Sequence, residues 1–179
     1  AGFSPHVIAV GPAMPVTDAA GLLAALRERP GHYNCATAGR GSGVHAAEEL
    51  FRAVTRTQFE MVHYRGGGPL IAALLAGEAH FATPTMASSI AQVRAGTLKA
   101  VGVASARRTP VLSDVPSAPE IGLPDMVFEE FFPILAPART PRTVVDTLAY
   151  AFRQAIQRAA PRLAEMAGVI PRTGYATPT

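Results

Sequence analysis

The sequence predicts an α/β fold in which a mainly parallel sheet is flanked by helices. Short apolar runs typical of strands alternate with longer stretches of helical periodicity, and turns containing glycine or proline separate them. Because parallel neighbours need a helical crossover, this order favours a sheet covered on both faces. The chain has 179 residues, of which 49% are hydrophobic and 16% charged, so it can bury a substantial core.

The first strand and helix are expected within residues 6–29. Residues 6–10 form a short apolar run that ends at a Gly-Pro pair, which is typical of a strand. Residues 19–29 have leucines at helical spacing and are followed by a Pro-Gly pair, which indicates a helix and its end. Either Thr17 or Asp18 is the expected N-cap of this helix.

Two glycine-rich turns follow, each between a predicted strand and a predicted helix. We name residues 37–43 the first glycine turn and residues 65–69 the second glycine turn. Since both turns follow strands of one parallel sheet, we expect them at the same edge of that sheet. The flanking elements are strands at 33–36 and 59–64 and helices at 44–54 and 70–76.

The rest of the chain continues this order and then departs from it. Residues 83–85 are expected to open a helix that runs to residue 93, and residues 99–104 to form a buried strand. The proline-rich stretch 110–124 indicates an extended connection. Beyond it we expect a strand at 131–137 interrupted by proline, a long helix at 141–158 and a shorter one at 161–167. Residues 7–130 are therefore predicted as one α/β unit and residues 131–179 as a segment of another.

Composition argues against several classes of protein. The net charge of +3 comes from 16 basic and 13 acidic residues that are scattered along the chain, aromatic residues are 7% and Trp is absent, so we expect no nucleic-acid partner. Cys35 is the only cysteine, so the fold contains no internal disulfide, and no metal-type Cys/His cluster or cofactor motif is present. No stretch of about 18 apolar residues is available to span a membrane.

The glycine turns are the best candidates for binding chemistry. Glycine lets the backbone approach a ligand closely, and the first N–H groups of a helix have no partner within it, so each turn presents donors to an anion. Two such turns at one edge predict a cradle for a carboxylate. The hydroxyls of Thr37 and Ser42 are placed to assist, although Ser42 is equally suited to capping its own helix.

An enzymatic alternative rests on Ser42 and His45, which are three residues apart at a helix start. This pair would suit an acyl- or phosphate-processing enzyme, but the surrounding sequence matches neither a nucleophile elbow nor a dinucleotide loop, and no orienting carboxylate is evident. A sensor or interaction domain that reuses the fold is a third possibility. His63 and His80 are interpreted as structural residues. Adjacent residues of a strand point to opposite faces, so the pair at 129–130 is interpreted as solvent-facing carboxylates.

Four segments in order resemble the tripartite tricarboxylate transporter receptor family, also called the Bug family. They are NCATAGRGSGVH at 34–45, YRGG at 64–67, DVPSAPEIGLP at 114–124 and LAPARTP at 135–141. Each motif alone is weak, but four in the right order are specific. The resemblance extends over residues 7–173.

This resemblance implies a receptor of the periplasm with two α/β lobes, as in other periplasmic binding proteins. Such a protein closes around a small carboxylate and delivers it to a membrane permease of the transporter. Residues 7–130 would be the second ligand-binding lobe, and residues 131–179 a C-terminal helical segment of the first lobe. The ligand-binding residues that we predict from the turns and the resemblance are Thr37, Ala38, Gly39, Gly41, Ser42, His45, Tyr64, Arg65, Gly66, Gly67 and Thr83.

The sequence departs from the family pattern in two respects. It contains no aromatic-Pro-x-Gly-Gly loop, so we expect the N-terminal half of the first lobe to be missing and an exposed sheet edge to be open to self-association. His80 and Pro84 occupy positions where relatives often have Asp, so the resemblance does not specify the polar tail of the ligand.

Overall fold

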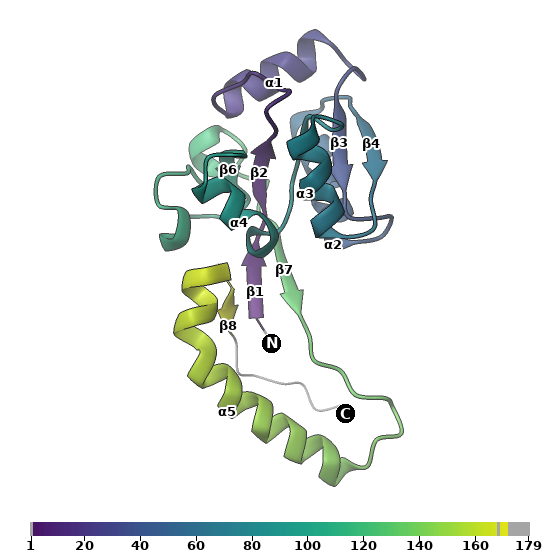
Figure 1. Cartoon of the computed structure of the whole chain (residues 1–179), viewed down its shortest axis with the longest axis vertical. Helices are drawn as coiled ribbons and strands as arrows, with labels where there is room; N and C mark the ends of the chain where they lie inside the picture. Colours follow the sequence, from purple (N-terminus) through teal and green to yellow (C-terminus); the bar gives the residue numbers. More distant parts are fainter. Residues whose placement is uncertain (1, 168, 172–179) are drawn as a thin grey trace.

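The computed structural model describes residues 2–167 and 169–171, which form two sheets joined by crossing strands (Figure 1). The larger sheet has five strands in the order β4-β3-β5-β2-β6, and the smaller has three in the order β7-β1-β8. The larger sheet contains β2 (Val7–Val10), β3 (Asn34–Thr37), β4 (Glu60–His63), β5 (Phe81–Ala82) and β6 (Lys99–Val103).

Four of the five strands in the larger sheet run in the same direction. Strand β3 pairs parallel with β4 and β5, whereas β2 pairs antiparallel with β5 and β6. The prediction of an α/β fold with a mainly parallel sheet is therefore confirmed, and β2 is the one reversed strand of this sheet.

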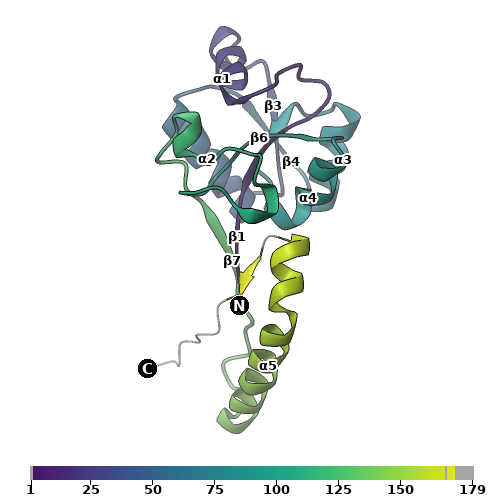
Figure 2. The same ribbon diagram turned by 90° about the vertical axis from the view of Figure 1, so that its left-hand side faces the viewer.

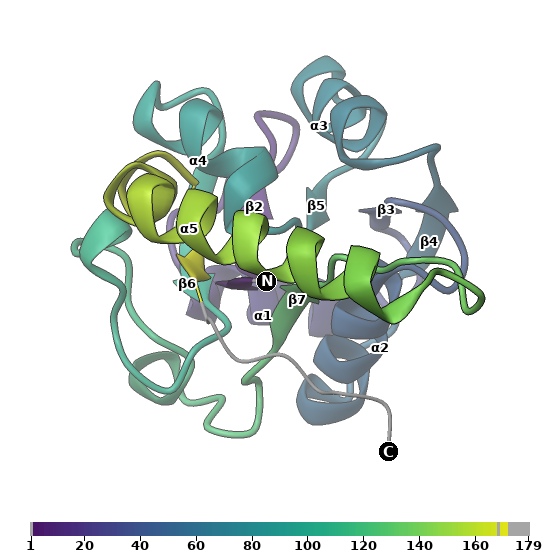
Figure 3. The ribbon, with the colours of Figure 1, turned by 90° about the horizontal axis from the view of Figure 1, so that it is seen from below.

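Helices cover both faces of the larger sheet (Figure 3). One core joins α1 (Ala19–Glu28) and α2 (Gly43–Thr55) to one face, and the other face packs against α3 (Gly67–Ala76) and α4 (Met86–Arg94). Burial on both sides explains why every residue of β2 is apolar and at most 1% exposed.

The structure selects one of the two predicted caps for α1 and corrects the predicted start of α3. Helix α1 has Asp18 as its N-cap, with the carboxylate accepting a hydrogen bond from the amide of Gly21 at 2.7 Å. Helix α3 begins at Gly67 and not at residue 70, because part of the second glycine turn already has helical geometry. The proline-rich stretch is also not extended throughout, since 3₁₀ turns occur at Pro110–Leu112 and Pro119–Ile121, each with proline at its start.

The C-terminal segment differs from the prediction in two ways. Strand β7 spans Glu129–Phe132 and so lies earlier than predicted. The two predicted helices are one continuous helix, α5 (Arg142–Ala167), with Pro161 inside it. A proline removes one intrahelical hydrogen bond, but it does not end this helix.

The chain crosses twice between the two sheets. Strand β1 (Gly2–Pro5) leads into β2 with only His6 between them, and it pairs with β7 and with β8 (Ile170–Pro171). The amide of His6 donates to the carbonyl of Phe128 at 3.3 Å, and the amide of Ala104 donates to the carbonyl of His6 at 2.8 Å. The smaller sheet and α5 therefore extend from one edge of the larger sheet (Figure 2). No helix among the described residues has the length and apolarity needed to cross a membrane.

Candidate ligand-binding site

The two glycine turns lie side by side at one edge of the larger sheet. They follow β3 and β4, which are parallel neighbours with Thr37 opposite His63. The amide of Tyr64 donates to the carbonyl of Thr37 at 2.8 Å, and the amide of Gly66 donates to the carbonyl of Ala38 at 3.1 Å. The sheet thus brings together two segments that are almost thirty residues apart in sequence.

Helices α2 and α3 both begin at this edge with free backbone amides. Among the residues that the structure describes, none accepts a hydrogen bond from the amides of Gly43 and Val44 in α2 or of Gly67 and Gly68 in α3. Pro69, the third residue of α3, has no N–H to satisfy. These amides and the positive ends of two helix dipoles favour an anion at this edge.

Two glycines in these turns have backbone conformations that other residues avoid. Gly39 has a φ of 123°, and Gly66 has a φ of 108° with ψ of 178°. A Cβ at Gly39 would also lie 3.3 Å from the carbonyl oxygen of Tyr64. Glycine is required at both positions because L-residues are strained in this region.

Ser42 and His45 are engaged with the backbone of α2. The Ser42 hydroxyl accepts a hydrogen bond from the His45 amide at 3.1 Å, which makes Ser42 the N-cap of the helix. The His45 ring accepts a hydrogen bond from the Gly41 amide at its Nδ1, at 3.2 Å, and its Nε2 lies 3.8 Å from Glu49. No hydrogen bond joins the Ser42 hydroxyl to the His45 ring within the described chain, so the contact that a serine nucleophile would need is missing.

Thr37 and Thr83 were predicted at the ligand, and the structure places both fully buried beneath the turns. They surround the carboxyl group of Glu48, which comes from α2 and is also fully buried. Burial raises the pKa of Glu48 to about 8, although the Thr37 hydroxyl, the Thr83 amide and the Cys35 thiol act in the opposite direction. The carboxyl group is therefore mainly neutral near pH 7.

Sequence reasoning overlooked Glu48, although a sign of it was present. Residues Val44, Ala47 and Phe51 form the buried stripe of α2, and Glu48 lies on the same face. An acidic residue within an apolar stripe indicates a buried carboxyl group, which needs either a partner or a proton.

The remaining predicted residues lie at the rim of the turns. Arg65 is exposed, and Tyr64 is half-buried. Burial, followed by the nearby carboxylate of Glu78, raises the pKa of Tyr64. The His63 ring lies 5.3 Å from that of His45, and burial together with Arg40 and His45 lowers the pKa of His63. A neutral His63 adds no charge to the edge.

His80 and Pro84, which stand where relatives often have Asp, lie at opposite ends of β5. His80 precedes the strand and so is at the far edge of the sheet, where its Nδ1 accepts a hydrogen bond from the Asn34 amide at 3.0 Å. Pro84 follows the strand and is buried, with its carbonyl accepting from the Val7 amide at 2.9 Å. The geometry of His80 agrees with its interpretation as a structural residue.

Glu130 is a second residue whose environment the sequence did not reveal. It was expected to face solvent, but its side chain is only 28% exposed and turns toward the start of α2. A Cβ at Gly43 would collide with the Glu130 carboxylate. The interpretation of Glu130 as a solvent-facing carboxylate was therefore wrong, because its side chain packs against the first residue of α2.

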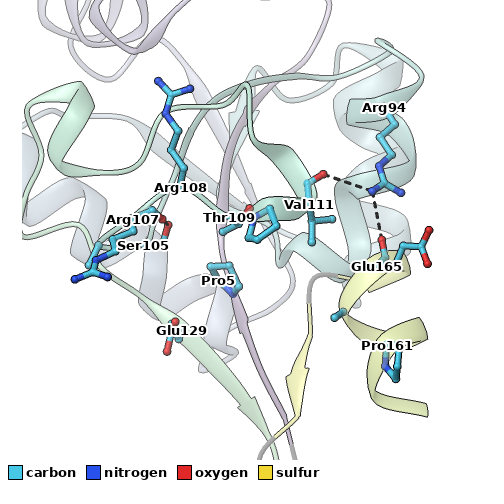
Figure 4. Close-up of a pocket in the computed structure, with 13 residues that line it drawn as sticks. Pro5, Arg94, Ser105, Arg107, Arg108, Thr109, Val111, Glu129, Pro161 and Glu165 are labelled. Atoms are coloured by element: carbon cyan, nitrogen blue, oxygen red, sulfur yellow. Dashed lines mark hydrogen bonds between the residues drawn. The ribbon is translucent and has the colours of Figure 1, made fainter. Parts of the chain in front are cut away.

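A cavity of about 680 Å³ lies elsewhere, between the larger sheet and α5 (Figure 4). Pro5 and Glu129 form part of its wall, and none of the residues predicted from the sequence lines it. The guanidinium of Arg94 donates to the carbonyls of Val111 at 3.4 Å and of Glu165 at 3.3 Å, so it is already engaged. The amides of residues 106–109 in its wall also have no acceptor among the described residues, but no α-helix begins in this lining. The glycine turns, where two helices begin side by side, remain the better candidate for an anion.

Comparison with known proteins agrees with this geometry. The family model described as tripartite tricarboxylate transporter family receptor matches residues 2–168. A UPF0065 protein encoded in the tcbD-tcbE intergenic region of Pseudomonas sp. (strain P51) is 35% identical over 90% of this chain and 48% of its own. BugT of Bordetella pertussis is 29% identical over 87% of this chain and 48% of its own. The chain thus spans about half the length of these relatives.

Solved structures with the same fold include two from Rhodopseudomonas palustris. Rpa4515 with adipate has a TM-score of 0.88 at 28% identity, covering 95% of this chain and 57% of that protein. MatC with bound malate has a TM-score of 0.88 at 26% identity, covering 94% of this chain and 58% of that protein. Together with the family match over most of its residues, these similarities show that the chain belongs to the tripartite tricarboxylate transporter receptor family.

Proposed function

We propose that this chain is the ligand-binding part of a periplasmic receptor that captures a small carboxylate on the two glycine turns. The observation that carries the proposal is the set of free amides at the adjoining starts of α2 and α3. Hydrogen bonds to a charged group stabilise it by roughly 1.5–3 kcal/mol each, so a few such donors hold one carboxylate without an arginine.

The related structures support a carboxylate as the ligand. Rpa4515 was solved with adipate and MatC with bound malate, and both proteins superpose closely on this chain. The two acids share carboxylate groups and differ in length and substituents, which agrees with recognition through backbone amides. The role is binding and not catalysis, and we propose delivery of the ligand to a membrane permease of the tripartite tricarboxylate transporter.

We further propose that residues 7–130 form one ligand-binding lobe and that residues 131–179 belong to the other. Residues 168 and 172–179 of this segment lie outside the described residues. In support, β7 belongs to the smaller sheet and not to the larger one, and it pairs there with β1, the first strand of the chain. Closure of two lobes around a ligand would use the crossings at His6 and Phe128 as hinges.

The test compares two substitutions at Gly67, the first residue of α3. A Cβ at this position would lie 3.3 Å from the Cβ of Ser88, so Gly67→Ala and Gly67→Pro both introduce that contact, and only proline removes the amide donor. Proline is compatible with the first position of a helix, and the ψ of 178° at Gly66 suits the residue before it.

Calorimetric titration with adipate and with malate measures the outcome. We expect the wild type and Gly67→Ala to bind at least one of these acids, and Gly67→Pro to bind it about tenfold more weakly or worse. The uncharged diamide of adipic acid is the ligand control and should not bind. Equal affinity of the alanine and proline variants would show that this amide does not hold the ligand.

A further inference from the structure

The Glu130 carboxylate lies at the proposed site but comes from a different part of the chain. Strand β7 carries the Glu130 side chain to the first residue of α2. The Glu130 side chain meets Gly43, whose own amide is one of the free donors. An acceptor oxygen thus stands beside the donors that are proposed to hold a carboxylate.

Glu130 lies close to the ring of His6 on its other side, and a hydrogen bond from the opposite ring nitrogen fixes the orientation of that ring. Nδ1 of His6 lies 2.6 Å from the carbonyl oxygen of Thr83. A carbonyl oxygen can only accept, so Nδ1 carries a hydrogen. Nε2 of the same ring lies 3.5 Å from Oε2 of Glu130, and His6 is fully buried.

Nε2 of His6 is buried and has no hydrogen-bond partner among the described residues, and the Glu130 carboxyl group lies near it without bonding to it. The other carboxyl oxygen of Glu130, Oε1, is the one that contacts Gly43.

We propose that Glu130, which lies beside His6, is a specificity-determining residue that selects carboxylates carrying a hydrogen-bond donor, a hydroxyl or an ammonium group, on a carbon next to the carboxylate. This inference rests on the proposed function, since it requires the ligand carboxylate to bind at the start of α2. An acceptor left without a donor in a closed site costs affinity, so the plain acid is disfavoured.

The test uses L-malate and succinate, two dicarboxylates that differ only by one hydroxyl group. Calorimetric titrations of the 179-residue chain should show L-malate binding about tenfold more tightly than succinate. In Glu130→Leu, which removes the acceptor, the two affinities should agree within about twofold. In Glu130→Gln, whose amide oxygen still accepts, a preference for L-malate should return.

A matched control comes from the neighbouring residue. Glu129 has the same side chain but lies on the opposite face of β7, at the wall of the separate cavity. Glu129→Leu should therefore keep the full preference for L-malate.

The possible failures are distinguishable. If the wild type binds neither acid, the proposed function falls and the inference falls with it. If both acids bind equally to the wild type, or if the preference survives in Glu130→Leu, only the inference is overturned. A loss of preference in Glu129→Leu equal to that in Glu130→Leu would also overturn it, because the effect would then come from net charge.

Discussion

At the scale of single residues, Glu48 links the stability of the lobe to pH. Its carboxyl group is fully buried, and burial raises its pKa from an ordinary value of 4.5 to about 8. Between these pH values the folded protein keeps a proton that the unfolded chain has lost. The stabilisation that this proton gives is therefore complete below about pH 4.5. As the pH rises toward 8, the free energy of unfolding falls by about 1.4 kcal/mol per pH unit at most.

Glu48→Gln should remove this dependence, because glutamine resembles the neutral acid and has no proton to lose. We expect the variant to exceed the wild type in free energy of unfolding by on the order of 2–4 kcal/mol at pH 8, and by much less at pH 5. Urea denaturation at several pH values measures both. Glu49→Gln, one position away and exposed, is the control and should follow the wild type. Parallel curves for Glu48→Gln and the wild type would contradict the expected shift.

Gly66 is the residue whose backbone conformation most restricts the second glycine turn. Its φ of 108° and ψ of 178° lie in a region that only glycine occupies readily. Gly66→Ala should lower the free energy of unfolding by about 1–3 kcal/mol, although nothing lies within 4 Å of the added methyl group.

Gly68→Ala is the matched control for this substitution. Position 68 also has open space around its Cβ but has no positive φ, so alanine there should be neutral or stabilising by up to about 1 kcal/mol. Thermal unfolding of the two variants separates the effect of backbone strain from the effect of added side-chain volume. A Gly66→Ala protein as stable as Gly68→Ala would mean that the turn has a different conformation in solution.

At the scale of elements, the start of α1 is a case in which the local sequence pattern does not decide between two caps. The sequence favoured both Thr17 and Asp18 as the cap, and in the structure the Asp18 carboxylate accepts the Gly21 amide at 2.7 Å. Asp18→Ala should cost about 1 kcal/mol in free energy of unfolding, whereas Thr17→Ala should cost less than about 0.5. Chemical denaturation of both variants tests this, and equal losses would contradict the assignment of the cap.

Most elements follow from local patterns, and the exceptions have identifiable causes. Apart from the short strand β5 and the start of α3, the strands and helices of the larger sheet fall where apolar periodicity and glycine turns predict them, because these features act within a few residues. Helix α5 was predicted as two helices because Pro161 usually ends one. Strand β1 was not predicted at all, since its partners β7 and β8 come from the other end of the chain.

At the scale of the whole molecule, the segment outside the larger sheet exposes many apolar side chains. These are Phe131, Phe132, Ile134, Leu135, Val144, Leu148, Tyr150 and Phe152. Exposed apolar side chains that gather in one segment promote association, and this supports the prediction that an exposed edge pairs with another copy. We therefore expect this chain to self-associate through β7 and α5.

Val144→Lys should reduce this association, because it places a charge on the exposed face of α5. Sedimentation velocity at several concentrations should show a shift toward the monomer relative to the wild type. Val127→Lys is the control, since Val127 is 42% exposed and Val144 is 44% exposed, but Val127 precedes β7 and lies outside α5. If both variants shift the equilibrium equally, the interface does not involve α5 specifically.

Local sequence patterns were sufficient to predict the α/β order, the two glycine turns and the family. Each of these depends on features that act over a few residues: apolar periodicity, the conformational freedom of glycine, and short motifs. The free amides at the helix starts follow from the same local rules, since every helix begins with unsatisfied donors. The prediction that both turns meet at one edge also needed only strand direction.

Which side chains surround that edge depends instead on packing between distant parts of the chain. Thr37 and Thr83 face inward to Glu48, His80 lies at the far edge of the sheet, and Glu130 reaches α2 from β7. The Glu130 and Gly43 contact joins residues almost ninety positions apart in sequence, and no local pattern encodes which side chains meet across that separation. Their positions are set by how the crossing strands pass along the larger sheet, because that packing determines which groups are buried and which carboxylate needs a proton.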